Sequence, residues 1–174
     1  VKLGNNRYMM AIRGGLIRVI PLFIIGSIPL ILTNLPVESW ANAMKPFYDS
    51  LNTVFNMTFG FMSLWLALSI GAEMARIYKL DETMISIVSV ACYMISASPI
   101  NLKDGTVTVS AWGSNTMFLA FVVGIVVAEV MRLFRDHNWG IKLPGGVPEN
   151  ITASFASLIP MAVLFVFFWF LRVI

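Results

Sequence analysis

Long stretches without aspartate, glutamate, lysine or arginine alternate with short polar segments along this chain of 174 residues. A charged side chain at the centre of a bilayer costs about 2.5–3.5 kcal/mol, so such stretches indicate membrane spans. About 20 helical residues cross the hydrocarbon core. Five stretches reach this length, and they cover Val19–Val37, Ser50–Ala72, Thr83–Leu102, Gly105–Ala128 and Asn150–Leu171. The pattern therefore predicts an all-α integral membrane protein with five transmembrane helices, at about 16–35, 52–72, 83–100, 112–131 and 152–172.

The composition agrees with this pattern. Hydrophobic residues make up 58% of the chain and charged residues only 12%, whereas a soluble domain carries about 25% charged residues. We expect the lipid bilayer to surround the chain, and residues 1–174 to form a single membrane domain. The formal net charge of +3 is small, and we expect no nucleic-acid partner.

Basic residues are distributed unevenly between the two sides of these predicted helices. The N-terminal segment and the second and fourth connections share one side, and they hold Lys2, Arg7, Arg13, Arg18, Arg76, Lys79, Arg132, Arg135 and Lys142. The opposite side holds Lys45, Lys103 and Arg172. Because cytoplasmic segments carry an excess of lysine and arginine, the pattern predicts a cytoplasmic N-terminus and an external C-terminus.

The connections between spans also carry local patterns. In Leu35–Phe55, apolar residues recur at helical spacing with one interruption at Pro46, so we expect an amphipathic helix on the outer membrane interface. Asn101–Ser110 holds an Asp-Gly pair followed by Thr/Val alternation, which predicts a tight outer turn or small hairpin. Asp81 is predicted to cap the N-terminus of the third span.

Small residues recur every four positions in the second and fourth spans. Such residues let helix backbones approach closely. We expect them to form a helix-packing seam, either within the chain or between the subunits of a dimer. The residues of this predicted seam are Ser63, Ala67, Gly71, Ala120, Gly124 and Ala128.

The first span contains Pro21, Gly26 and Pro29. A proline inside a helix removes a backbone hydrogen bond and bends the helix. Two interpretations follow: a hinge or broken helix beside a permeation path, or a static bend that packing accommodates.

Four hydroxyl groups share one face of the third span, because they follow one another at intervals of three, four and three residues. This face either lines a polar cavity or bonds to the preceding helical turn and to neighbouring helices. The four residues are Ser86, Ser89, Tyr93 and Ser96.

The inner ends of the second and fourth spans share a motif, Ala-Glu-x-x-Arg followed by an apolar, an aromatic and a basic residue, at Ala72–Lys79 and Ala128–Arg135. Glutamate and arginine three residues apart can pair on a helix. Near the membrane interface, such residues mostly anchor a helix. The predicted pairs are Glu73 with Arg76 and Glu129 with Arg132.

No residue pattern in the chain predicts catalysis. The single histidine, His137, has no cysteine or carboxylate cluster beside it, so the sequence predicts no metal site. One cysteine, Cys92, cannot form an internal disulfide. A glycine-rich phosphate loop is also missing from the sequence. We therefore assign no catalytic residue, metal ligand or cofactor to this chain.

Three stretches resemble the membrane component IIC of the bacterial sugar phosphotransferase system, in its lactose/cellobiose type. Lys2–Leu32 looks like the opening of that family, and Tyr78–Met94 looks like its second inner turn and third helix. Ile141–Pro160, "IKLPGGVPENITASFASLIP", is the most specific match. Gly14 and Gly145 depart from the family pattern, in which aspartate is usual at both positions.

The resemblance covers only the N-terminal half of such a transporter. It implies a multi-pass protein of the bacterial inner membrane that forms homodimers, and in which this half supplies the scaffold and the dimer interface. It further implies uptake of a β-linked disaccharide such as cellobiose, chitobiose or lactose, with soluble IIB and IIA components as partners. The sugar-contacting residues belong to the other half, so none is assigned here.

The segment before the fifth span is predicted to be a stiff inner loop. It contacts a neighbouring subunit or the IIB component, or it serves as a simple connector. The residues of this predicted partner-contact loop are Lys142, Pro144, Gly145, Gly146, Val147 and Pro148.

The chain starts at Val1 rather than at a methionine, and it stops soon after the last span. We therefore expect it to be part of a longer permease. The alternative is a stand-alone small membrane channel, or an assembly or scaffold protein, derived from the same family.

Overall fold

The computed structural model describes residues 6–97, 100–101, 105–141 and 149–173. Its helices are α1 (Arg7–Thr33), α2 (Glu38–Met44), α3 (Tyr48–Phe55), α4 (Met62–Tyr78), α5 (Glu82–Ala97), α6 (Met117–Asp136) and α7 (Glu149–Val173). Short 3-10 turns cover Lys45–Phe47, Val109–Trp112 and Ser114–Thr116, and a π-helical segment covers Asn56–Gly60. Two strands, β1 (Ile100–Asn101) and β2 (Thr106–Val107), complete the described elements.

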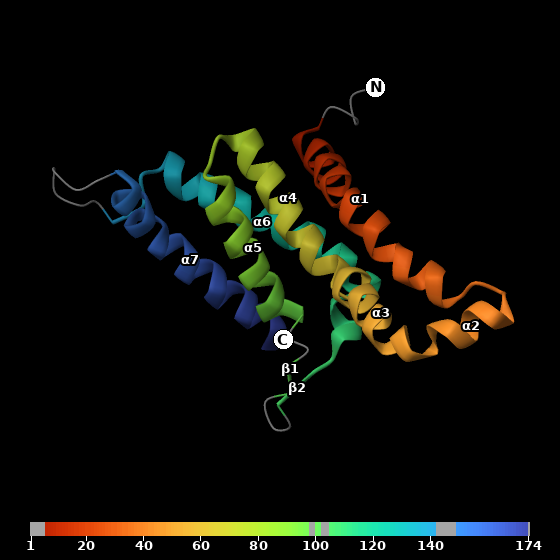
Figure 1. Cartoon of the computed structure of the whole chain (residues 1–174). Helices are drawn as coiled ribbons and strands as arrows, with labels where there is room; N and C mark the ends of the chain where they lie inside the picture. The colour runs from red at the N-terminus through yellow and green to blue at the C-terminus, as the bar shows by residue number, and fades with distance from the viewer. Residues whose placement is uncertain (1–5, 98–99, 102–104, 142–148, 174) are drawn as a thin grey trace.

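Helix α4 lies at the centre of the bundle and packs against α1, α5 and α6, while α7 packs against α5 and α6 (Figure 1). Because α4 is surrounded by other helices, its side chains form the centre of the core. Leu66, Ile70 and Met74 of α4 have no exposed surface at all, although each has a large side chain. In contrast, α1 and α7 bury only a narrow stripe of their apolar surface, as expected for helices that turn their outer faces to lipid.

Three helical segments are long and apolar enough to cross a membrane, namely Arg7–Thr33, Ser114–Asp136 and Phe155–Val173. A fourth span results if Glu38–Gly60 and Met62–Tyr78, which meet at an angle of 42°, count as one. The predicted span at 83–100 corresponds to α5, which ends at Ala97 and has only 16 residues. The described residues thus support an all-helical membrane bundle, and the number of five spans stays a prediction.

The predicted amphipathic segment is helical from Glu38 to Phe55, and Pro46 lies in the 3-10 turn that separates α2 from α3. The indole nitrogen of Trp40 donates a hydrogen bond of 2.8 Å to the carbonyl oxygen of Leu32, which ties α2 to the end of α1. Its place on the outer membrane interface stays a prediction.

Two local predictions for the connections are confirmed. β1 and β2 form a small antiparallel hairpin in which Ile100 lies opposite Val107, and Gly105 in its turn has a φ of +62°, which glycine adopts without strain. At the start of α5, Oδ1 of Asp81 accepts a hydrogen bond of 2.8 Å from the backbone nitrogen of Met84, the geometry of an N-cap.

Helix α1 continues through Pro21 and Pro29 without interruption, so the interpretation of a broken helix is wrong. Gly26 is buried against the π-helical segment, where an added Cβ would lie 2.2 Å from Oγ1 of Thr58. Close packing at this glycine favours the static bend over the hinge.

Candidate functional site

The six residues of the predicted seam are all buried, and they line the contacts that α4 makes with its neighbours. At Gly124 of α6, an added Cβ would lie 3.0 Å from Cγ2 of Ile70 and 3.1 Å from the backbone nitrogen of Gly71. At Gly71, it would lie 2.3 Å from Oγ of Ser89 on α5. The backbones of three helices therefore converge at one point, because two glycines leave the space.

These seam contacts lie within one chain. Ser63 extends the seam towards the other end of α4, where its hydroxyl donates a short hydrogen bond to the carbonyl oxygen of Gly113. A second close contact joins α4 to α1, since the hydroxyl of Ser69 donates to the carbonyl oxygen of Gly15 over 2.8 Å. A contact of the seam residues with a second subunit stays a prediction.

Glu73 is the most deeply buried charged residue described, with only 6% of its side chain exposed. Its carboxylate pairs with Arg76 one turn later on α4, as predicted, and with Arg18 of α1 at 3.0 Å. The same nitrogen of Arg18 lies 3.3 Å from the carboxylate of Glu82 on α5. One arginine thus connects three helices near the end of the bundle where α4 meets α5.

Gly14 of α1 leaves the space that the carboxylate of Glu73 occupies. A Cβ at this position would lie 2.7 Å from the carboxyl carbon of Glu73, so any larger residue would displace the side chain. An aspartate at position 14 would also place a second negative charge against Glu73. The glycine at this position is therefore suited to the burial of Glu73.

A second cluster lies at the same end of α4 and joins it to α6. The hydroxyl of Tyr78 donates a short hydrogen bond to the carboxylate of Glu129, which also pairs with Arg132 at 3.1 Å. The guanidinium of Arg132 lies 4.6 Å from the centre of the Tyr78 ring, and that of Arg7 on α1 lies 5.6 Å from it. Such cation–π contacts contribute about 0.5–2 kcal/mol each.

Three of the four hydroxyls on this face of α5 have hydrogen-bond partners, while the buried hydroxyl of Ser89 has none among the described residues. Ser86 donates to the carbonyl oxygen of Glu82 over 2.6 Å, and Ser96 donates to that of Cys92 over 2.8 Å. The hydroxyl of Tyr93 lies 2.6 Å from that of Thr116. These contacts fit the interpretation of packing between helices rather than a polar cavity.

The predicted partner-contact loop, from Lys142 to Pro148, lies outside the described residues, so its role stays a prediction. Within the described ranges, no group of three or more histidine, cysteine, aspartate or glutamate side chains is placed to hold a metal ion. The ion pairs that Arg18 makes across helices, with Glu73 and Glu82, lie towards the end of the bundle where α4 ends and α5 begins (Figure 1).

A helical bundle with apolar outer helices, and with its ion pairs gathered at one end, is the arrangement expected of an integral membrane protein. Residues 13–174 match the family described as "Phosphotransferase system, EIIC", and the chain therefore belongs to this family of sugar permeases. The predicted membership in the phosphotransferase IIC family is thereby confirmed.

Known relatives are similar over almost the whole chain. The "PTS system cellobiose-specific EIIC component" of Geobacillus stearothermophilus is 32% identical, and the "Lichenan permease IIC component" of Bacillus subtilis (strain 168) is 30% identical; each alignment covers 99% of this chain and 42% of the relative. The crystal structure of the transporter ChbC, the IIC component from the N,N'-diacetylchitobiose-specific phosphotransferase system, matches with a TM-score of 0.89 and 28% identity, over 99% of this chain and 44% of that one. The chain thus spans about two fifths of the length of the curated relatives.

Replacing Gly124 by leucine is expected to lower the free energy of unfolding by about 1–3 kcal/mol, because the new side chain must push α6 away from α4. Equilibrium unfolding in mixed detergent–SDS micelles measures the effect. Val122→Leu is the matched control, since Val122 is on the same helix and 47% exposed. Equal stability of the two variants would contradict the close backbone contact.

Replacing Glu73 by glutamine is expected to cost about 1–3 kcal/mol, because two arginines lose the charge of a buried partner. Glu82→Gln, at a side chain that is 45% exposed, should cost at most about 1 kcal/mol. The same unfolding measurement compares the two variants. If Glu82→Gln proved the more damaging, Glu73 would not hold the three helices together.

Proposed function

We propose that this chain forms the N-terminal scaffold half of an EIIC permease that takes up a β-linked disaccharide such as cellobiose, chitobiose or lactose. The observation that carries the proposal is the match to ChbC, which covers nearly all of this chain but less than half of that transporter. Relatives named for cellobiose and lactose support the substrate class. The whole chain, residues 1–174, acts as one membrane domain in this proposal.

The packing of the bundle supports a scaffold role. A sugar site needs several hydrogen-bonding side chains that converge on a cleft. The buried hydroxyls of Ser63, Ser69 and Tyr93 instead bond to neighbouring helices or connections. The cross-helix ion pair of Glu73 with Arg18 and the Tyr78–Glu129 contact fix the helices against one another. Such groups stabilise a fixed arrangement and offer little to a sugar.

Five spans with a cytoplasmic N-terminus, an external C-terminus and an α2–α3 segment on the outer interface complete the proposal. The inner membrane of a bacterium is the proposed location. In support, Arg7 begins α1, Arg76 lies in the last turn of α4 and Arg135 lies in the last turn of α6, so basic residues gather at one end of the bundle. The α2–α3 segment and the hairpin lie at the opposite end (Figure 1).

Soluble IIB and IIA components are the proposed partners, together with a second copy of the same permease. Support comes from the family and from relatives named EIICB, a designation that joins a C and a B component in one chain. The phosphoryl group would pass from IIB to the sugar without touching a residue of this chain. The Lys142–Pro148 loop is proposed to contact IIB or the neighbouring subunit. The alternative of a stand-alone channel has less support, because the relatives are permease components.

Cysteine labelling tests the orientation. In a Cys92→Ala background, which removes the only cysteine, we expect Asp49→Cys to react with a membrane-impermeant maleimide in intact cells. Lys79→Cys should react only after the membrane is opened. Both positions lie at ends of the bundle and outside the core. The reverse labelling pattern would overturn the proposed orientation.

A chimera tests the scaffold role. This chain, joined to the C-terminal part of the cellobiose-specific relative from Geobacillus stearothermophilus, is expected to take up and phosphorylate cellobiose in cells that contain IIB and IIA. The chain alone should insert and form crosslinked dimers without any uptake. Cellobiose uptake by the chain alone would contradict the proposal and favour the stand-alone channel.

The same chimera distinguishes the roles of the inner loop. Deleting residues 144–146 should reduce sugar phosphorylation several-fold, while leaving insertion and dimer yield unchanged, if the loop contacts IIB. Lower dimer yield would assign the loop to the subunit contact instead, and unchanged phosphorylation and dimer yield would make it a simple connector.

A further inference from the structure

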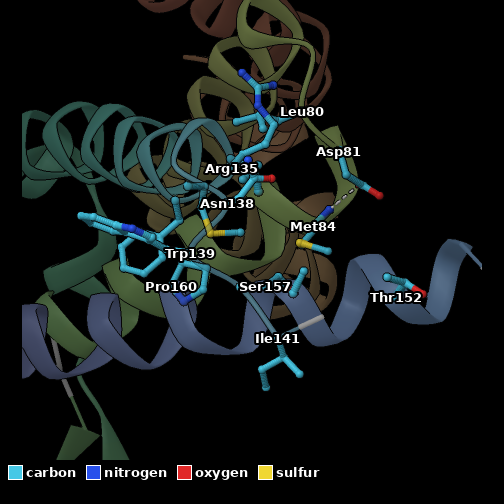
Figure 2. Close-up of a pocket in the computed structure, with 15 residues that line it drawn as sticks. Leu80, Asp81, Met84, Arg135, Asn138, Trp139, Ile141, Thr152, Ser157 and Pro160 are labelled. Atoms are coloured by element: carbon cyan, nitrogen blue, oxygen red, sulfur yellow. Dashed lines mark hydrogen bonds between the residues drawn. The ribbon is translucent and has the colours of Figure 1, made fainter. Parts of the chain in front are cut away.

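A cavity of about 570 Å³ lies at the basic end of the bundle, between the start of α5, the end of α6 and the first half of α7 (Figure 2). Its volume falls within the range of about 300–1,000 Å³ that is usual for ligand pockets. Most of its wall is apolar, and the wall includes Met84 and Ile85 of α5, Met131 and Phe134 of α6, and Ala156 and Pro160 of α7.

The charged groups in the wall are already engaged elsewhere. The guanidinium of Arg135 donates to the carbonyl oxygen of Tyr78 over 2.7 Å and pairs with Asp136 at 2.8 Å. The carboxylate of Asp81 caps α5 through the backbone nitrogen of Met84. A polar ligand such as a sugar would therefore find few charged partners, whereas an apolar ligand suits the mostly apolar wall.

The surface beside the cavity is apolar as well. Phe155, Leu158 and Ile159 of α7 are each more than 40% exposed, and they alternate with the cavity-lining residues of the same helix. Trp139 lies at the rim with 59% of its surface exposed. Tryptophan is enriched where a bilayer meets water. The cavity therefore borders an apolar, exposed surface of α7, and a residue typical of the membrane interface lies at its rim.

We propose that this cavity binds one acyl chain of a membrane phospholipid, which fills the space between α7 and the α5–α6 pair. Acyl chains are the abundant apolar groups at this depth of a bilayer, and an empty apolar space of this size would forfeit the dispersion contacts of its whole wall. The bound chain acts as a structural lipid that completes the packing of α7 against the α4-centred core.

Tryptophan quenching by brominated phosphatidylcholine tests the proposal. Two single-tryptophan forms of the chain, one with Trp139 and one with Trp169, are prepared by replacing the other tryptophans with phenylalanine. Trp169 lies far along α7 and is 57% exposed, so it matches Trp139 in exposure and reports contact with bulk lipid. Each form in detergent micelles is titrated with the brominated lipid.

Trp139 is expected to reach half-maximal quenching at a brominated-lipid fraction about tenfold lower than Trp169, because Trp139 lines the proposed lipid site and Trp169 does not. Met84→Phe and Thr152→Phe, which enlarge two cavity-lining side chains, should each abolish this difference. Leu158→Phe, at an exposed position of α7 outside the cavity wall, should preserve it.

Equal quenching curves for Trp139 and Trp169 would overturn the proposal, since they indicate bulk lipid only. The proposal is equally overturned if a folded Met84→Phe or Thr152→Phe form keeps the full difference. Circular dichroism verifies the fold of each variant, and two independent blocking positions keep the test decisive when one variant does not fold.

Discussion

The close approach of α4 to three neighbouring helices is the constraint on which the rest of the structure depends. A single added Cβ would overlap the Ser89 side chain of α5 at Gly71, and at Gly124 it would press tightly against Ile70 and the backbone of α4. In a bilayer, helices gain little from hiding apolar surface from lipid, so association rests on van der Waals contact and a few hydrogen bonds. Small residues at the contact therefore have a larger effect than large apolar ones, and they fix how α5 and α6 lie against α4.

The charged residues then fix the orientation of the bundle along its axis. Arg18, Glu73 and Glu82 come from three different helices and meet at one end, while Tyr78 and Glu129 join α4 to α6 at the same end. Charges are costly in hydrocarbon and persist there only when paired. A set of cross-helix pairs at one end allows that end to lie at the membrane interface, and it restrains sliding of the helices past one another.

Features that depend on neighbours in sequence were predictable. The Asp81 cap, the hairpin around Gly105 and the pairing of Glu73 with Arg76 each require only a few consecutive residues. The apolar stretches likewise predicted most helices, since a charge-free run is a direct consequence of the cost of burying charge. The four-residue spacing of the small residues is visible in the sequence for the same reason, because it follows the helical repeat.

Features that depend on the arrangement of helices were not predictable. Nothing in the sequence indicates that Arg18 reaches Glu73, because the two residues lie on helices that only the fold brings together. The π-helical segment before α4 and the length of α5, which ends at Ala97, also depend on tertiary packing. The cavity beneath Trp139 arises where three separate helices fail to fill the space between them, and no sequence pattern records such a gap.

The chain belongs to the EIIC family, and we propose that it forms the part of a permease that stays fixed while sugar crosses the membrane. The most direct test of the scaffold account is pulsed electron paramagnetic resonance on the chimeric permease, with spin labels on exposed Arg13 of α1 and Leu133 of α6. The account predicts a single narrow distance distribution that stays the same when cellobiose and phosphorylated IIB are added. A second distance that appears with the sugar would contradict it.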